Sequence, residues 1–122
     1  MARPGRVLVV EDEPAVGEVA TAALADAGHE VRWARDGRAG LAALREWPAD
    51  VIVLDLMMPV LDGWGFRAEQ RRLASPLSQV PVVILSGARD AASAAKDLDA
   101  AGLVVKPFAL EALIEAVQSA LR

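Results

Sequence analysis

The chain has 122 residues, the length of one domain, and on folding a domain of this size buries roughly two-thirds of its unfolded surface. Its 13 Lys and Arg residues against 17 Asp and Glu residues give a formal net charge of −4, which argues against a nucleic-acid or anionic-membrane surface because a polyanion needs a basic patch. No cysteine is present, so disulfide scaffolds, thiolate metal sites and thiol nucleophiles are excluded.

The opening residues MARPGR lead into no long apolar segment. No apolar run approaches the ~18 to 20 residues that a membrane span needs. We therefore expect a cytoplasmic protein in which residues 1–122 form one domain.

The chain begins with a buried strand and an amphipathic helix. Val7–Val10 is apolar, rich in β-branched residues and without polar alternation, as in a strand covered on both faces of a parallel sheet. The apolar residues that follow recur on one face of a helix, which Pro14 can begin and Gly28 can end.

An alternating segment and a second helix come next. In HEVRWA, residues 29–34, apolar and polar side chains alternate, which predicts a half-exposed edge strand. The only histidine, His29, is expected to be solvated there, and Trp33 is interpreted as packing. Asp36–Trp47 has helical periodicity, and Pro48 stops this helix.

The second half of the chain repeats the pattern three times. Further buried runs occur at Val51–Leu54, Val82–Leu85 and, shorter, Leu103–Val105. Helical segments follow them at 62–74, 90–101 and 110–121, and Asp62 is expected to cap the first. Leu98 is the only large apolar residue of the segment 90–101, so we expect this helix to be the most weakly anchored.

Strand and helix thus alternate five times, which predicts an α/β fold with right-handed crossovers. We expect a flavodoxin-like, doubly wound sheet of five parallel strands in the order 2-1-3-4-5, with five helices. In such a sheet, ligands bind outside the carboxyl ends of the strands, where the strand order reverses. The residues directly after the strands are therefore the candidates for a functional site.

Polar residues stand directly after four of the predicted strands, namely Glu11–Glu13, Asp55, Ser86 and Lys106. With the expected strand order they share one pocket. Carboxylates a few ångströms apart repel by roughly 3 to 4 kcal/mol per pair at an effective dielectric of ~20, which a structural role alone does not explain. A divalent cation offsets this repulsion, and all-oxygen ligands favour Mg²⁺. A cation beside a carboxylate, a hydroxyl and an ammonium is typical of phosphoryl transfer.

Four segments carry a resemblance to a known family: VLVVEDEP at 7–14, LDLMMPVLDG at 54–63, ILSG at 84–87 and VVKPF at 104–108. In this order and spacing, the chain resembles the receiver domain of two-component response regulators over residues 1–122. The resemblance implies a phosphoprotein of bacterial-type signalling that takes a phosphoryl group from a histidine kinase or a histidine phosphotransfer protein. Such a domain catalyses its own phosphorylation and slow autodephosphorylation without being a turnover enzyme.

The resemblance also implies a role for each residue at the strand ends. Asp55 would be the phosphoacceptor, and Mg²⁺ would be held by Asp12, by Glu11 through water, by Asp55 and by the main-chain carbonyl of Met57. Ser86 would hydrogen-bond the phosphoryl oxygens, Lys106 would pair with them, and the Lys106–Pro107 bond would be cis.

Two departures from the family pattern motivate hypotheses. Leu103 stands where the family usually carries an aromatic switch residue, so we hypothesise that phosphorylation instead shifts the loosely packed helix at 90–101. Met57 and Ala88 stand where the family flanks the path of the hydrolytic water, and neither side chain can orient a water. We therefore predict an acyl phosphate that lasts on the order of hours rather than seconds.

The partners follow from the same resemblance. His29 is far along the chain from these motifs, so the donor must be another protein or domain. No DNA-binding module follows the last helix, so we expect output through an unknown downstream protein, with no nucleic acid and no membrane. The family pattern also allows a dimer through the fourth helix, the fifth strand and the fifth helix.

Three other functions compete with this interpretation. A flavin or dinucleotide carrier shares the fold but needs a Gly-rich or Ser/Thr-rich loop where Glu11–Glu13 stand. A Mg²⁺-dependent nuclease or topoisomerase-type domain needs paired acids at alternate positions after the third strand, and residues 55–57 provide one. A pseudo-receiver, which binds partners without being phosphorylated, stays open as the alternative, although the acceptor Asp, the acids and the Lys are all present.

Overall fold

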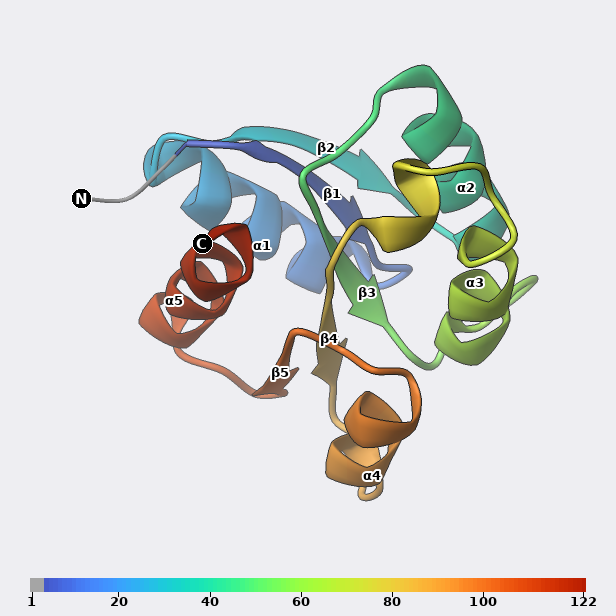
Figure 1. Ribbon diagram of the computed structural model, residues 1–122. Coiled ribbons are helices and arrows are strands. Elements are labelled where there is room, and N and C mark those ends of the chain that lie inside the picture. Colours follow the sequence, from blue (N-terminus) through green and yellow to red (C-terminus); the bar gives the residue numbers. More distant parts are fainter. Residues whose placement is uncertain (1–3) are drawn as a thin grey trace.

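The computed structural model describes residues 4–122 and shows one five-stranded parallel sheet between two layers of helices (Figure 1). The strand order β2-β1-β3-β4-β5 confirms the predicted doubly wound, flavodoxin-like topology. The strands are β1 (Arg6–Val10), β2 (Glu30–Ala34), β3 (Val51–Asp55), β4 (Val82–Ser86) and β5 (Gly102–Val105). The helices are α1 (Pro14–Asp26), α2 (Gly37–Glu46), α3 (Gly63–Gln70), α4 (Ala91–Asp97) and α5 (Leu110–Leu121), with a 3₁₀ turn at Leu77–Gln79.

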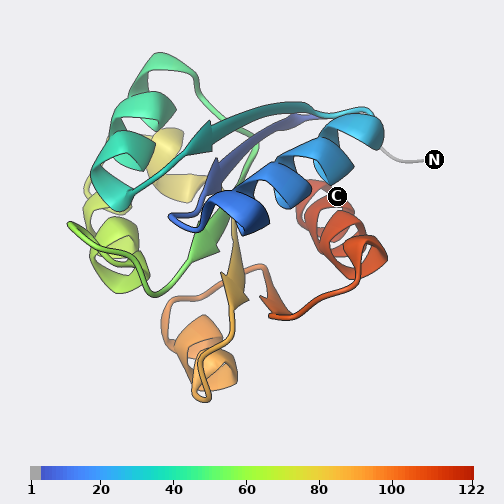
Figure 2. The ribbon, with the colours of Figure 1, turned by 180° about the vertical axis from the view of Figure 1, so that it is seen from behind.

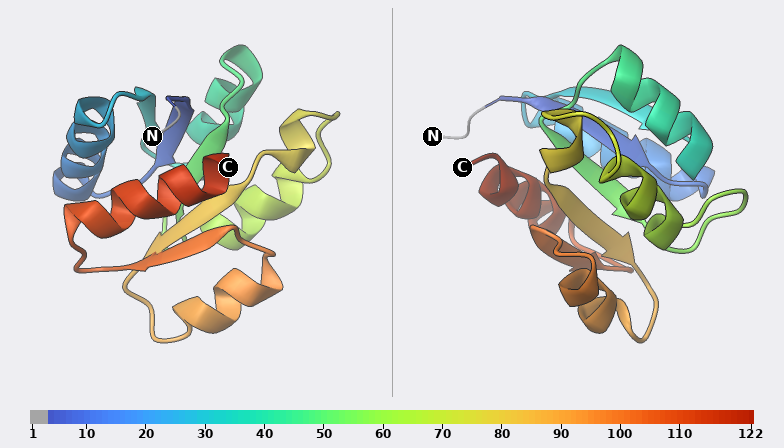
Figure 3. Two further views of the ribbon diagram at one scale, coloured as in Figure 1. Left: turned by 60° about the vertical axis from the view of Figure 1, so that its left-hand side comes forward. Right: turned by 45° about the vertical axis from the view of Figure 1, so that its right-hand side comes forward.

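Each face of the sheet has its own apolar core. Because successive side chains of a strand point to opposite faces, Val7 and Val9 pack against α1 and α5, whereas Leu8 and Val10 pack against α2 and α3. Figures 2 and 3 show α1 and α5 together on one face and α2, α3 and α4 on the other. Covering both faces explains why the central strands are continuously apolar, while the edge strand β2 alternates in burial as predicted.

Two helices end earlier than their periodicity predicts. The helix α3 ends at Gln70 instead of about residue 74. There the Gln70 side chain turns inward and donates to the carbonyl oxygens of Leu77 and Val80, at 3.1 and 3.0 Å, as the chain turns away. The helix α4 ends at Asp97, and Asp99 adopts a left-handed φ of 53°, which breaks the helical path before residue 101.

The expectation that His29 is solvated is wrong. His29 precedes β2, is only 5% exposed, and accepts a hydrogen bond at Nδ1 from the Gly5 N–H at 3.1 Å. It therefore ties the start of β1 to the turn before β2, at the amino ends of the strands.

The helix α4 has the poor apolar face expected from sequence, since its buried residues are Ala91 and Ala94, followed by Leu98. Its carboxyl end is nevertheless bonded to α3. Arg67 Nε donates to the Leu98 carbonyl at 3.1 Å, and Arg71 Nη2 donates to the same oxygen at 2.7 Å. Polar contacts thus anchor the helix that was predicted to be held most weakly.

Every helix within residues 4–122 is too short or too polar to cross a lipid bilayer.

Candidate functional site

Three carboxylates meet where β1 and β3 end. Val10 is paired with Leu54 in the parallel register, so Glu11 and Asp55 leave the sheet side by side. Glu11 and Asp55 are buried, with 0% and 3% exposure, and Asp12 is half-buried. One carboxylate oxygen from each of Glu11, Asp12 and Asp55 lies within 4.8 Å of the other two. The sheet register therefore brings together the acids that the sequence placed at one rim.

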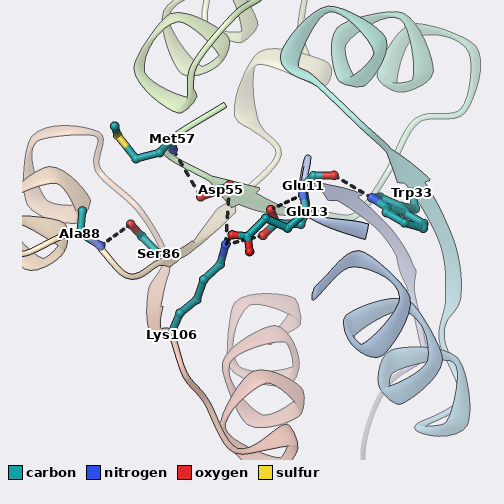
Figure 4. A network of polar contacts seen from close by, with 8 residues as sticks. All are labelled: Glu11, Glu13, Trp33, Asp55, Met57, Ser86, Ala88 and Lys106. Atoms are coloured by element: carbon teal, nitrogen blue, oxygen red, sulfur yellow. Dashed lines mark hydrogen bonds and ion pairs between the residues drawn. The ribbon is translucent and has the colours of Figure 1, made fainter. Parts of the chain in front are cut away.

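The ammonium of Lys106 points into this acidic cluster from the end of β5 (Figure 4). Its Nζ lies 2.8 Å from Glu11 Oε1, 2.9 Å from Glu13 Oε1 and 3.7 Å from Asp55 Oδ2. The main-chain N–H of Lys106 donates to the Ser86 carbonyl at 2.9 Å, which ties the start of the loop after β5 to the neighbouring strand β4. The Lys106–Pro107 bond is cis, as expected.

Ser86 ends β4 beside Asp55, since Asp55 is paired with Leu85 in the register. Its Oγ accepts a hydrogen bond from the Ala88 N–H at 3.1 Å, which leaves the hydroxyl proton free to donate elsewhere. Asp55 Oδ1 accepts from the Met57 N–H at 3.3 Å. A pocket of about 560 Å³ joins these groups, lined by Glu13, Asp55, Met57, Trp64, Ser86, Gly87, Ala88, Asp90 and Lys106.

The crowding of charge shifts two pKa values. Burial, together with the hydrogen bond and negative charge of Glu11, raises the pKa of the Asp55 carboxyl from 3.8 to about 7, against the opposing charge of Lys106. Burial lowers the pKa of the Lys106 ammonium, but the hydrogen bonds of Glu11 and Glu13 outweigh it, so the net shift is upward. The rim thus places the protonated ammonium of Lys106 beside the Asp55 carboxyl, whose ionisation is disfavoured.

The donor set of the acidic cluster fits Mg²⁺. Asp12 Oδ1 is buried and has no hydrogen-bond partner within residues 4–122, although a buried carboxylate oxygen ordinarily has one. Hard oxygen ligands from one or two carboxylates are the set that Mg²⁺ prefers. Glu11, Asp12 and Asp55 are the side chains placed to hold such an ion.

The loop after β3 is shaped by Gly63. A Cβ on Gly63 would lie 2.8 Å from the Asp55 carbonyl oxygen and from the Leu56 Cα, and the Gly63 N–H donates to the Leu56 carbonyl at 2.9 Å. The absence of a side chain therefore lets α3 begin directly over the end of β3. Asp62 caps this helix, as predicted, by accepting from the Gly65 N–H at 2.8 Å.

Two contributions to the rim were missed from sequence. Glu13 was not assigned a role, yet it shares the Lys106 ammonium with Glu11. Trp33 was interpreted as packing alone, but its indole Nε1 donates to the Glu11 carbonyl oxygen at 2.9 Å. The one sequence feature that could have indicated this contact of Trp33 is Gly17, because a glycine inside a helix often marks close packing.

Comparison with known proteins agrees with this geometry. The family described as response regulator receiver domain matches residues 7–118. The chain is 38% identical over 119 residues to the transcriptional activator protein IrlR of Burkholderia pseudomallei, covering 96% of this chain and 50% of that protein. It is 39% identical over 122 residues to the response regulator MprA of Mycolicibacterium vanbaalenii, covering 98% of this chain and 51% of that protein.

The chain therefore spans about half the length of these curated relatives. Among solved structures, the chemotaxis protein CheY4 of Vibrio cholerae is similar with a TM-score of 0.86 and 32% identity, covering 98% of this chain and 100% of that one. The family match, the relatives and the shared fold lead to one conclusion. The chain belongs to the receiver-domain family of two-component response regulators.

Proposed function

We propose that residues 1–122 act as one receiver domain that accepts a phosphoryl group on Asp55, with Mg²⁺ held by Asp12, Asp55, the Met57 carbonyl and, through water, Glu11. The observation that carries this proposal is the position of the Lys106 ammonium, 3.7 Å from Asp55 Oδ2 at a rim that also presents three clustered carboxylates. A cation fixed beside a buried carboxylate is suited to neutralising charge on a transferring phosphoryl group.

The proposed transfer moves the phosphoryl group from nitrogen to oxygen. A carboxylate oxygen of Asp55 attacks the phosphorus of a phosphohistidine carried by a partner. The P–N bond breaks, the imidazole keeps that electron pair and takes up a proton, and the new P–O bond makes an acyl phosphate on Asp55. Lys106 would pair with the phosphoryl oxygens, and the free hydroxyl proton of Ser86 would donate to them. When bound, Mg²⁺ supplies further charge neutralisation at these oxygens.

The site is tested most directly with a phosphoryl mimic and a small donor. We expect beryllofluoride to bind with 1:1 stoichiometry by ¹⁹F NMR only when Mg²⁺ is present, and acetyl phosphate to add one phosphoryl group by intact mass. Asp55→Asn should abolish both results. Asp62→Asn is the matched control, because Asp62 lies on the same loop and only caps α3. If the wild-type protein binds neither Mg²⁺ nor beryllofluoride, it is a pseudo-receiver instead.

A groove beside the site supports a protein donor. A pocket of about 420 Å³ between α1 and the loop before α5 is lined by Glu13, Ala15, Val16, Val19, Lys106, Pro107 and Phe108. Glu13 and Lys106 also line the Asp55 pocket, so a phosphohistidine protein seated in the groove would have its imidazole close to the acceptor. We propose this groove as the docking site of the kinase or phosphotransfer protein.

Phosphotransfer profiling against the histidine kinases of the host would identify a donor for this test. Val19 is 47% exposed, so Val19→Glu should leave the fold intact while disrupting an apolar contact. We expect phosphotransfer from the protein donor to slow by at least about tenfold. Labelling by acetyl phosphate should not change, and if both reactions slow equally, the groove is not the docking site.

The lifetime of the acyl phosphate depends on how water is held in the Asp55 pocket. Met57, which is 65% exposed, and Ala88 line this pocket with groups that cannot orient water. We predict a half-life on the order of hours, and a decrease on the order of tenfold in Met57→Asn, whose amide can hydrogen-bond a water. The decay of intact phosphorylated mass measures both, and wild-type decay within seconds would contradict the prediction.

We propose that the phosphorylated domain signals through contacts with a downstream protein. The surface formed by α4, β5 and α5 is the predicted contact surface, and it is also the predicted dimer interface. On this face Val105, the last residue of the edge strand β5, is an apolar side chain with 53% exposure. The cytoplasmic location and the lack of nucleic-acid and membrane contacts stay predictions.

A further inference from the structure

Trp33 in β2 holds the main chain of the acidic rim. Its indole Nε1 donates to the Glu11 carbonyl oxygen at 2.9 Å (Figure 4). The Glu11 N–H donates to the carbonyl oxygen of the next residue, Ala34, at 3.0 Å. Two consecutive residues of the edge strand therefore bond both main-chain polar groups of Glu11, and this segment cannot rotate without breaking one of the bonds.

The indole reaches this position because α1 has no side chain there. A Cβ built on Gly17 would lie 2.1 Å from Trp33 Cζ2 and 2.6 Å from Nε1, so any larger residue would displace the ring. Glycine is an unfavourable residue inside a helix, and here it admits the indole. Arg35 lies over the same ring, with its guanidinium carbon 4.4 Å from the ring centroid. The ring is thus contacted by α1 and by Arg35, the residue after β2.

The acidic rim needs such a restraint. The carboxylates of Glu11, Asp12 and Asp55 repel one another, and the loop that carries the first two would relax outward if it were free. Within residues 4–122, the residue before α1, Glu13, makes no capping hydrogen bond with its side chain to the first turn of that helix. The Lys106 ammonium holds the side chains of Glu11 and Glu13, whereas the main chain of Glu11 is held by Ala34 and Trp33.

We propose that Trp33 is a positioning residue for the metal site: its indole N–H holds the Glu11–Asp12 segment against carboxylate repulsion and so sets the affinity for Mg²⁺. This inference rests on the proposed function, because it concerns the same acidic cluster. Groups that orient metal ligands from outside the ligand set typically change metal affinity by about 10- to 100-fold.

The test compares two Trp→Phe variants of the full chain by calorimetric Mg²⁺ titration. Trp33→Phe keeps an aromatic ring against Gly17 but removes the N–H donor, and it should weaken Mg²⁺ binding by about tenfold or more. Trp47→Phe is the matched control, because Trp47 is 7% exposed and its ring centroid lies 5.5 and 5.0 Å from the guanidinium carbons of Arg6 and Arg32, away from the rim. It should change the affinity by less than about twofold.

A second variant separates the positioning role from helix stability. Gly17→Ala should favour α1 by helix propensity, yet its Cβ would push the indole away. We therefore expect weaker Mg²⁺ binding from a substitution that otherwise suits a helix. In wild-type protein, the Trp33 indole N–H signal should shift in ¹H–¹⁵N spectra on Mg²⁺ saturation, and this measurement decides the question if neither variant folds.

The outcomes distinguish this inference from the proposed function. If wild-type protein binds Mg²⁺ and Trp33→Phe binds it equally well, or if Trp47→Phe weakens binding as much, the positioning role is wrong and the metal site stands. An indole N–H signal of Trp33 that does not shift on Mg²⁺ saturation would likewise show that the positioning role is wrong. If wild-type protein binds no Mg²⁺ at all, the proposed function fails and the inference fails with it.

Discussion

Arg67 in α3 and Asp55 at the end of β3 both carry buried charges, with 7% and 3% of each residue exposed, but their surroundings differ. Arg67 donates to the carbonyl oxygens of Leu98, Val80 and Asp99 and to the Gln70 side chain, at 2.8 to 3.4 Å. Asp55 accepts one hydrogen bond from the Met57 N–H at 3.3 Å and otherwise faces two further carboxylates and one ammonium.

The difference separates a structural charge from a functional one. Burial lowers the pKa of the Arg67 guanidinium, but its fixed acceptors hold the charge in place between α3, β4 and α4. The Asp55 carboxylate lies among like charges, which is unfavourable in the resting protein and suited to binding a cation. A buried charge with satisfied hydrogen bonds therefore stabilises the fold, whereas one crowded by like charge marks the site.

The largest effect on stability is expected from removing the satisfied charge. Arg67→Ala removes the donor to the Asp99 carbonyl oxygen and to Gln70 Oε1, takes one of two donors from each of the Leu98 and Val80 carbonyl oxygens, and opens a cavity. We expect a loss of about 2 to 4 kcal/mol in the free energy of unfolding, measured by urea denaturation. Arg72→Ala, at an exposed position two residues beyond α3, should change it by less than about 0.5 kcal/mol. A loss at Arg67 as small as that at Arg72 would contradict the comparison.

A smaller effect of opposite sign is expected from removing the crowded charge. The Asp55 carboxyl ionises near 3.8 in the unfolded chain and at about 7 in the metal-free folded protein. The folded state therefore binds more protons between these values, and its stability falls as the pH rises through that window. Asp55→Asn should be more stable than wild type in EDTA at pH 8, by about 1 to 3 kcal/mol, and should lose this advantage by about pH 4.

Urea denaturation in EDTA across this pH range measures the effect. Asp97→Asn is the control, because Asp97 is an exposed carboxylate at the end of α4, and its substitution should stay within about 0.5 kcal/mol of wild type at both pH values. If Asp55→Asn is less stable than wild type at pH 8, the Asp55 carboxylate is not destabilised by neighbouring negative charge in the metal-free protein.

The two regions also differ in how far sequence could predict them. The strand-end residues Glu11, Asp55, Ser86 and Lys106 were predicted to share a rim because parallel strands present their carboxyl ends at one edge, and the register brings them there. The buried role of Arg67 was not predictable from periodicity. In the segment 64–72 Arg67 looks like one more polar helix residue, since its main-chain acceptors lie 13 to 32 residues later in the chain.

Other differences have the same physical origin. Trp33 and His29 each bond a main-chain group more than 20 residues away, at Glu11 and Gly5, and no local pattern encodes such partners. The ends of α3 and α4 likewise depend on the inward turn of Gln70 and the left-handed backbone of Asp99. Tertiary hydrogen bonds thus account for most of what periodicity alone missed.

The smallest effect is expected at the surface, where charge is paired but not buried. Arg38 Nη1 lies 2.8 Å from Glu69 Oε1, closer than most acceptors of Arg67, but the Arg38 side chain is 59% exposed. Water and salt screen this pair, and holding two long side chains together opposes it entropically. A double-mutant cycle of Arg38→Ala and Glu69→Ala should therefore give a coupling of at most about 0.5 kcal/mol, falling further at high salt. Coupling comparable to the Arg67 effect would mean that distance, and not burial, decides what a charged contact contributes in this protein.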